Sequence, residues 1–280
     1  MKLYRVKTLT GPSWAVEEAG QLFPVHVPPT LHSDGTVRAV PDYTRSLGPV
    51  ANAALLAPAD PGKIIAIGAN YLDHVRETGM TPPPAPLIFA KFPNTLTGPD
   101  AVVEIDEDLT ERVDWEVELA LVIGRRMRNV SSEEALQGVL GYTIANDLSA
   151  RDVQFGDGQW VRGKSFDGFC PLGPALVTAE ELGDPQSLAM ETRVNGETVQ
   201  RSNTSEMLFG LREIVTYCAR NFTLEPGDLI LTGTPWGCGE FMTPRRSLAP
   251  GDRVELEIEG LGVLQHAMSA AARVQRIAAE

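Results

Sequence analysis

Apolar residues in this chain are gathered into short runs, most of which have the length of a β-strand. The clearest run covers Leu119 to Ile123, and further runs cover residues 63–68, 142–145 and 229–232. Short apolar runs bounded by turn residues are typical of buried strands. Residues 254–258 instead alternate between apolar and charged side chains, which predicts a strand with one exposed face.

Two segments carry the signals of a helix. Ser131 and Glu134 have the spacing of a capping box and predict a short helix that ends near Gly138 or Gly141. From about residue 204 to residue 222, apolar side chains recur every three or four positions, which predicts a second helix with one apolar stripe. Strands outnumber helices without regular alternation, so we predict an α+β, β-rich fold built on a mixed sheet.

The N-terminal part of the chain is rich in turn signals and predicts short strands joined by loops. Proline and glycine cluster at residues 58–62, where we expect a linker. We therefore divide the chain into a small N-terminal domain, residues 1–60, and a main domain, residues 61–280.

Composition and charge narrow the classes of partner. The 280 residues include 24 basic and 37 acidic side chains, and the formal net charge of −13 would repel nucleic acid and anionic membranes. Three widely spaced cysteines fit a reducing compartment and predict neither a disulfide framework nor a zinc site. Without a long apolar run or an export signal, we expect a cytoplasmic protein with no membrane or nucleic-acid partner.

Two carboxylates, Glu116 and Glu118, precede the apolar run 119–123. The two-residue period of a strand places both on one face, where burial is costly unless a cation compensates their charge. Asp147 follows the predicted strand 142–145 and offers a third oxygen ligand; its alternative role is a helix or turn cap. Three carboxylates without nearby cysteine or histidine favour Mg²⁺ or Mn²⁺.

Residues 158–165 match the phosphate-binding pattern G-x-x-x-x-G-K-[ST]. That loop needs a buried strand before it and a helix after it, whereas residues 151–157 are polar and residues 166–174 contain several glycines and prolines. We therefore set nucleotide binding aside and interpret Lys164 as a cation beside the three acids. Taken alone, it would be a surface lysine.

His74 and Glu77 lie three residues apart, a spacing that brings them together on a helical turn. A histidine held by a carboxylate is a recognised base for activating water. The alternative is a solvated loop histidine with an incidental neighbour, and a match this short does not decide between the two.

Five motifs occur in an order that resembles the fumarylacetoacetate hydrolase superfamily, whose bacterial members include acylpyruvate hydrolases, oxaloacetate decarboxylases and hydroxyheptadienedioate isomerases. Along the chain they read I-G-A-N-Y-L-D-H, D-W-E-V-E-L-A-L-V-I-G, N-D-L-S-A-R-D, K-S-F-D-G-F-C-P-L-G-P and L-T-G-T-P. The resemblance covers about residues 63–262. It implies a rolled mixed β-sheet catalytic domain, a small N-terminal domain and a homodimer.

The resemblance also implies a role for each candidate residue. The ligands expected for Mg²⁺ or Mn²⁺ are Glu116, Glu118 and Asp147. Lys164 is expected close to the metal, and His74 with Glu77 is expected as a water-activating dyad on a mobile lid. Gly233 and Thr234 match the segment with which family members hold the substrate carboxylate.

The implied substrate is a small 2-oxo or 2,4-dioxo acid. Breaking the bond beyond C3 leaves an enolate that the metal and Lys164 would stabilise. We expect hydrolytic C–C cleavage, a step typical of aromatic compound catabolism; decarboxylation and isomerisation are alternatives on the same scaffold. A noncatalytic ligand-binding relative is a further alternative, against which the intact His74, Glu77 and Lys164 argue.

The chain departs from the family pattern directly after the G-T-P segment. Trp236 stands where small residues are expected, and its indole is expected to narrow the pocket. Arg245 and Arg246 follow and are candidates for holding the distal carboxylate of a dicarboxylic substrate, with a solvated loop pair as the alternative.

Overall fold

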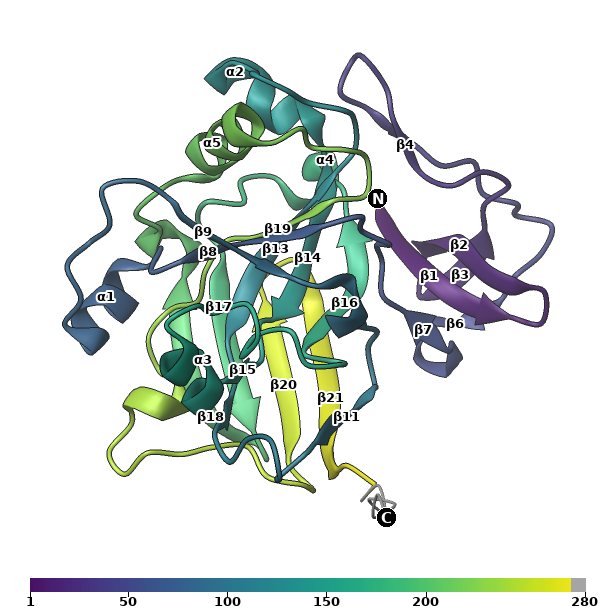
Figure 1. Cartoon of the computed structure of the whole chain (residues 1–280). Coiled ribbons are helices and arrows are strands. Elements are labelled where there is room, and N and C mark those ends of the chain that lie inside the picture. Colours follow the sequence, from purple (N-terminus) through teal and green to yellow (C-terminus); the bar gives the residue numbers. More distant parts are fainter. Residues whose placement is uncertain (273–280) are drawn as a thin grey trace, which may run out of the picture.

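A large mixed β-sheet and a smaller sheet pack against each other in the computed structural model, which describes residues 1–272 (Figure 1). The 12-stranded sheet runs in the order β6 (Gly48–Pro49), β3 (Gln21–Pro24), β2 (Gly11–Glu18), β1 (Lys2–Thr8), β16 (Cys170–Val177), β14 (Val139–Asn146), β13 (Val117–Ile123), β19 (Leu229–Leu231), β8 (Ile64–Gly68) and β9 (Leu87–Lys91), with β7 (Leu55–Leu56) on β1 and β10 (Leu96–Thr97) on β16. The five-stranded sheet runs in the order β11 (Val102–Ile105), β21 (Gly262–Ala270), β20 (Arg253–Ile258), β17 (Ala189–Val194) and β18 (Glu197–Asn203). This β-rich architecture confirms the predicted fold class.

Short elements complete the chain. Two further strand pairs are β12 (Val113–Asp114) with β15 (Ser149–Ala150), and β4 (Thr30–Leu31) with β5 (Val37–Arg38). The α-helices are α1 (Leu72–Thr78), α2 (Ser132–Ala135), α3 (Arg151–Asp157), α4 (Ala179–Leu182) and α5 (Leu211–Asn221). The 3₁₀ turns are η1 (Val50–Asn52), η2 (Pro93–Thr95), η3 (Leu136–Gly138), η4 (Thr204–Glu206) and η5 (Gly239–Phe241). Within the described residues, no helix is both long and apolar enough to cross a membrane.

Strand β13 is buried on both faces, as its continuous apolar run predicts. Its odd-numbered residues, including Leu119 and Leu121, join the core between the two sheets. Its even-numbered residues Ala120 and Val122 join a second core on the opposite face. Glu118 has the same parity as this second set, so the strand period places its carboxylate at the end of that face.

Most of the N-terminal strands, β1, β2, β3, β6 and β7, continue the large sheet, and only the short pair β4 and β5 is separate from it within the described residues. Strand β1 pairs with β16, with Lys2 opposite Val177, and Leu3 is buried in the second core. Figure 1 shows this segment to one side of the main body, although backbone hydrogen bonds connect the two. The division at residue 60 therefore stays a prediction about folding units.

The helix predictions are confirmed in one case and corrected in the other. Ser131 and Glu134 form the predicted capping box, and the helical segment ends at Gly138. The second helix begins at Leu211 and not near residue 204. Residues 204–206 form the separate 3₁₀ turn η4, and residues 208 and 209 are bends, where Leu208 donates its N–H to the Asn70 carbonyl at 2.7 Å.

Candidate metal centre and active site

Two antiparallel strands bring the three predicted acids together. Glu118 lies on β13 and Glu116 directly precedes this strand, so both carboxylates point to the same face. The register pairs Val117 with Asn146 and sets Asp147 opposite Glu116, whose carbonyl accepts the Asp147 N–H at 3.0 Å. One carboxylate oxygen from each acid lies within 4.8 Å of the others, and all three residues are buried.

The acidic cluster has the properties of a site for a hard cation. Glu118 accepts the backbone N–H of Gly233 at 2.8 Å, but it has no lysine or arginine ion pair within the described residues. Burial and the charges of Asp147 and Glu116 raise the pKa of Glu118 well above its ordinary value. A divalent cation would relieve this repulsion, and an all-carboxylate donor set suits Mg²⁺ or Mn²⁺. The residues therefore fit a divalent metal ion.

The lysine of the phosphate-loop pattern reaches this cluster instead of a nucleotide. Lys164 Nζ lies 2.7 Å from Glu116 Oε2 and 2.7 Å from Asp147 Oδ2. Burial disfavours the charged ammonium, but these two carboxylates outweigh burial and raise the pKa of Lys164. The close approach depends on Gly163, because a Cβ there would lie 2.7 Å from the backbone nitrogen of Gln154.

Arg151 belongs to the site although the sequence analysis did not single it out. It begins α3, and its buried guanidinium donates to Asp114 Oδ2 at 2.8 Å, Glu116 Oε1 at 2.6 Å and Gln154 Oε1 at 3.0 Å. Burial opposes ionisation of Glu116, but Lys164 and Arg151 together lower the pKa of Glu116 to about 2. The available signal was the place of Arg151 inside the motif N-D-L-S-A-R-D, which also contains the candidate ligand Asp147.

Lys91 is a second residue that the sequence analysis missed. It ends β9 with its side chain fully buried, and its Nζ lies 2.7 Å from Asp147 Oδ1. The same ammonium donates to the carbonyl of Leu148 at 3.2 Å and to the carbonyl of Lys164. Lys91 and Lys164 therefore hold Asp147 from its two oxygens. A lysine that ends an otherwise apolar strand was the available signal.

His74 and Glu77 form the predicted pair on helix α1. His74 Nδ1 lies 2.9 Å from Glu77 Oε2, and the other oxygen of Glu77 accepts the Gly237 N–H at 2.9 Å. Glu77 thereby connects α1 to the segment that follows the G-T-P motif. Because Nδ1 is held, the Nε2 edge of the ring is the part of His74 available to the cavity that it lines.

The G-T-P segment follows β19 and contacts the acidic cluster through its backbone. Gly233 has φ +97°, and a Cβ on it would lie 3.0 Å from the Ile67 carbonyl, so the N–H that contacts Glu118 comes from a position that requires glycine. Thr234 lines the cavity, and its hydroxyl accepts a hydrogen bond from Gln200 Nε2 at 3.0 Å.

Arg245 and Arg246 lie outside the cavity lining. Arg245 pairs with Glu240 at 3.3 Å and Arg246 pairs with Glu197 at 2.8 Å, so acids away from the metal centre hold both guanidinium groups. Trp236 does not narrow the pocket, contrary to the expectation. Its side chain is 46% exposed, and its indole N–H donates to a backbone carbonyl of β18 at 3.0 Å.

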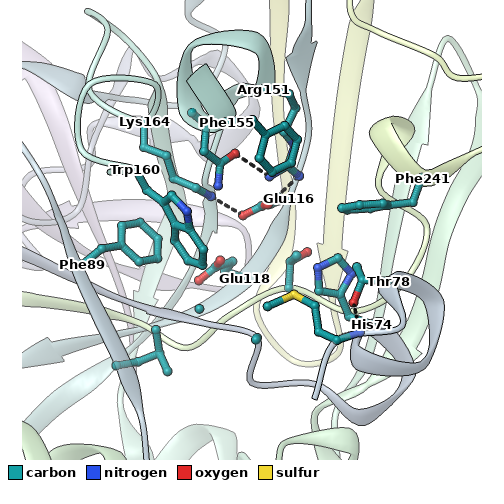
Figure 2. Close-up of a pocket in the computed structure, with 16 residues that line it drawn as sticks. His74, Thr78, Phe89, Glu116, Glu118, Arg151, Phe155, Trp160, Lys164 and Phe241 are labelled. Carbon is teal, nitrogen blue, oxygen red and sulfur yellow. Dashed lines mark hydrogen bonds and ion pairs between the residues drawn. The ribbon is translucent and has the colours of Figure 1, made fainter. Parts of the chain in front are cut away.

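One cavity of about 70 Å³ joins these groups (Figure 2). Figure 2 shows Phe89 and Trp160 on one side of the acids, with His74 and Phe241 on the opposite side. The cavity is lined by Ile67, Gly68, Ala69, His74, Thr78, Met80, Phe89, Glu116, Glu118, Arg151, Gln154, Phe155, Trp160, Lys164, Thr234 and Phe241. The cavity thus brings together two of the three candidate metal ligands, Glu116 and Glu118, with a lysine, a histidine and an aromatic wall.

Comparisons with known proteins identify a family for most of the chain. The sequence model of the family described as fumarylacetoacetate (FAA) hydrolase C-terminal matches residues 63–269. The mitochondrial oxaloacetate tautomerase fahd2 of Xenopus laevis is 44% identical over 234 residues, which cover 82% of this chain and 73% of the relative.

Solved structures extend the likeness to almost the whole chain. The fumarylacetoacetate hydrolase of Exiguobacterium antarcticum superposes with a TM-score of 0.86 at 39% identity, covering 97% of this chain and 100% of that one. The 2-hydroxyhepta-2,4-diene-1,7-dioate isomerase of Mycobacterium marinum superposes with a TM-score of 0.81 at 36% identity, covering 98% and 100%.

Proposed function

Because this chain belongs to the fumarylacetoacetate hydrolase family, we propose that it is a divalent-metal-dependent enzyme that interconverts the enol and keto forms of oxaloacetate or a closely similar 2-oxo acid. The observation that carries the proposal is that Glu116, Glu118, Lys164 and His74 line one cavity. Asp147 completes the acidic cluster beside it and contacts Lys164, and Glu77 holds His74. A relative named oxaloacetate tautomerase and a structural neighbour named isomerase support this type of reaction.

The net charge of the acidic cluster favours binding of a divalent cation, and the bound cation would in turn favour binding of an anionic substrate. Held by Glu116, Glu118 and Asp147, a divalent ion would supply Lewis-acid stabilisation of the enolate that forms from a 2-oxo acid. The buried charged residues in contact here are the acids Asp114, Glu116, Glu118 and Asp147 and the cations Lys91, Arg151 and Lys164. With all four carboxylates ionised, one negative charge is left in excess, which favours the divalent cation and disfavours an anion that arrives without it.

His74 is the group suited to moving the proton at C3 of the substrate. Glu77 accepts the hydrogen bond from Nδ1–H, so Nε2, the nitrogen available to the cavity, has the lone pair that can take the substrate proton and return it. Phe241 packs edge-on against the imidazole, with 5.5 Å between the ring centroids, and helps to exclude water. Lys164 places a fixed positive charge where the enolate develops negative charge.

Hydrolytic cleavage of a 2,4-dioxo acid is a second candidate, and the same dyad favours it. His74 would take a proton from water, water would attack the C4 carbonyl, and the electrons of the broken C3–C4 bond would pass to the enolate of pyruvate. The products are pyruvate and a carboxylate. Decarboxylation of oxaloacetate would use the same enolate without the water step.

Ketonisation of the enol of oxaloacetate tests the proposal. With Mg²⁺, the enzyme is expected to remove the enol absorbance faster than Mg²⁺ alone, and Glu118→Gln is expected to lower this rate about 100-fold. Glu107→Gln, at an exposed loop position, is the matched control. A rate no greater than that of Mg²⁺ alone would contradict the proposal. Splitting of acetylpyruvate without any effect on the enol would favour hydrolysis instead.

A further inference from the structure

Apolar side chains line the cavity where it opens to the solvent. Its buried end, which we call the charged floor, is lined by Glu116, Glu118, Arg151 and Lys164. Met80, Phe155 and Phe241 all line the cavity, and we call these three residues the rim. Met80 is 44% exposed and Phe155 is 52% exposed, so the rim presents large apolar surface to the solvent next to the catalytic groups. Exposed apolar surface that is continuous with a cavity is typical of a ligand-binding groove.

Three separate segments build the rim around the catalytic groups. Phe155 lies four residues after Arg151 on α3, so one helix face carries both the guanidinium that contacts Glu116 and the apolar ring at the mouth. Met80 directly follows Gly79, the left-handed residue that ends α1. Phe241 ends η5 and packs against His74, so a substrate that extends beyond His74 meets an aromatic ring.

The rim offers no partner for a second carboxylate. Within the part of the chain that the structure describes, the lysine and arginine side chains lining the cavity are Lys164 and Arg151, and carboxylates engage both. Arg112 packs 5.9 Å from the centre of the Phe155 ring, but Glu240 holds its guanidinium through two hydrogen bonds. A distal carboxylate would lose water here without a compensating charge, whereas a hydrocarbon chain would gain apolar contact.

We propose that the rim binds the part of the substrate beyond C4 and selects 2-oxo acids with an apolar chain over 2-oxo dicarboxylic acids of equal length. This inference rests on the proposed function, because it requires C1 and C2 of the acid at the metal centre. A four-carbon acid remains on the charged floor of the cavity. Longer 2-oxo or 2,4-dioxo acids place their chain against Met80, Phe155 and Phe241.

Calorimetry on the full chain with Mg²⁺ tests this selection without relying on turnover. The ligands are pyruvate, 2-oxohexanoate, 2-oxooctanoate and 2-oxohexanedioate. Each methylene that reaches the rim is expected to lower the Kd about threefold, because burial of a methylene is favourable. The length-matched comparison is expected to show 2-oxohexanoate binding about tenfold more tightly than 2-oxohexanedioate.

Variants then assign the selection to the rim. Phe155→Ser and Met80→Ser are expected to lower the ratio of the Kd for pyruvate to the Kd for 2-oxooctanoate about fivefold or more. Phe222→Ser is the matched control, since Phe222 is 42% exposed after α5 and does not line the cavity. An unchanged ratio in Phe155→Ser would overturn the inference, as would tighter binding of the dicarboxylate.

Two further outcomes separate this inference from the proposed function. If pyruvate binds with Mg²⁺ but the Kd is independent of chain length, the rim does not bind substrate and the proposed function stands. If no 2-oxo acid binds with Mg²⁺, the proposed function fails and the rim inference fails with it. A change of molar mass in Phe155→Ser by light scattering would identify the rim as a contact between subunits and overturn its assignment to substrate.

Discussion

Glu116 and Glu118 lie two residues apart, yet their surroundings give them different electrostatic properties. Glu116 is placed between Lys164 and Arg151, and these cations lower the pKa of its carboxyl to about 2 despite burial. Glu118 receives a single backbone N–H from Gly233, and burial next to other acids raises the pKa of its carboxyl. Glu118 is therefore the acid that depends most on a bound cation for its charge.

Replacing Glu118 by glutamine separates metal binding from folding. We expect Mn²⁺ affinity to fall about 100-fold or more, because one of three ligands is lost. The metal-free variant is expected to keep its Tm, because the amide removes a buried repulsion, but it loses the rise in Tm that Mn²⁺ gives the native protein. Calorimetry and thermal unfolding with Glu107→Gln as control measure both effects, and unchanged Mn²⁺ affinity would show that the metal binds elsewhere.

Substitutions in the His74–Glu77 dyad are expected to change the catalytic rate and not the affinity for the metal. His74→Gln and Glu77→Gln are each expected to lower kcat about 100-fold, because the proton-transferring imidazole is removed or loses its orientation. Mg²⁺ affinity is expected to stay within about twofold, since neither residue belongs to the three ligands. His32→Gln, at a site outside the cavity, is the control for steady-state kinetics. Normal kcat in His74→Gln would exclude the imidazole from proton transfer.

At the scale of elements, a series of side-chain hydrogen bonds connects Glu116, directly before β13, to the smaller sheet. Asn146 at the end of β14 accepts the Glu116 N–H through Oδ1 at 2.9 Å, which directs its amide nitrogen toward His266 Nε2 on β21 at 2.8 Å. The ring nitrogen must then accept, so the buried imidazole is neutral. Burial lowers the pKa of His266 to about 4.

This lowered pKa makes stability fall as the solution becomes acidic. The unfolded chain binds a proton at this histidine below about pH 6.5, whereas the native protein does so only near pH 4, so acidification between these values favours unfolding. The contribution of His266 to the free energy of unfolding is present above pH 6.5 and is expected to decline by about 3 kcal/mol by pH 4. Urea unfolding across this range measures the decline.

His266→Gln provides the comparison for that pH series. The glutamine does not titrate, so the variant is expected to lose less stability than the native protein between pH 6.5 and pH 4. His32→Gln is the control, because His32 is only half-buried and lies outside the core. Identical pH slopes for the native protein and His266→Gln would contradict the account.

The sequence predicted those elements whose local pattern agrees with their packing. The strands around Glu118 and Asp147 and the capping box at Ser131 were of this kind. The start of α5 was not, since a contact with Asn70, far away in the chain, holds the residues directly before the helix in a non-helical conformation. Arg151 was missed for the same reason, because only the folded structure shows that its guanidinium reaches Glu116.

The contacts of Lys91, Arg245 and Arg246 could not be predicted from the sequence. Lys91 contacts Asp147 from a strand 56 positions earlier in the chain, and no local pattern predicts that pairing. Arg245 and Arg246 were chosen for their charge, but Glu240 and Glu197 compete for them in the folded chain. The proximity of the three acids to Lys164, and of His74 to Glu77, was predictable because these residues stand in motifs whose order resembles one family, whereas the spacing of each motif alone left alternatives open. Their chemical roles stay predictions.

At the scale of the whole molecule, the N-terminal strands and the catalytic sheet form one hydrogen-bonded structure. Strand β1 covers the edge of β16, and Leu3 and Val16 fill the second core with residues of β13 and β14. A chain that starts at residue 61 would expose that edge and part of that core. We therefore expect this shortened chain to have a Tm about 10 °C lower or more, or to aggregate. Cooperative unfolding at the native Tm would show that residues 1–60 form an independent domain.

The central claim is that Glu116, Glu118 and Asp147 hold a divalent ion at which a 2-oxo acid is enolised with His74 moving the proton. Exchange of the C3 protons of pyruvate in D₂O, followed by ¹H NMR with Mg²⁺, measures enolisation directly and does not depend on which bond is broken afterwards. The account predicts loss of the C3 signal well above the rate with Mg²⁺ alone, and near-background rates in Glu118→Gln and His74→Gln. Exchange no faster than with Mg²⁺ alone, or equal exchange in the native protein and both variants, would contradict it.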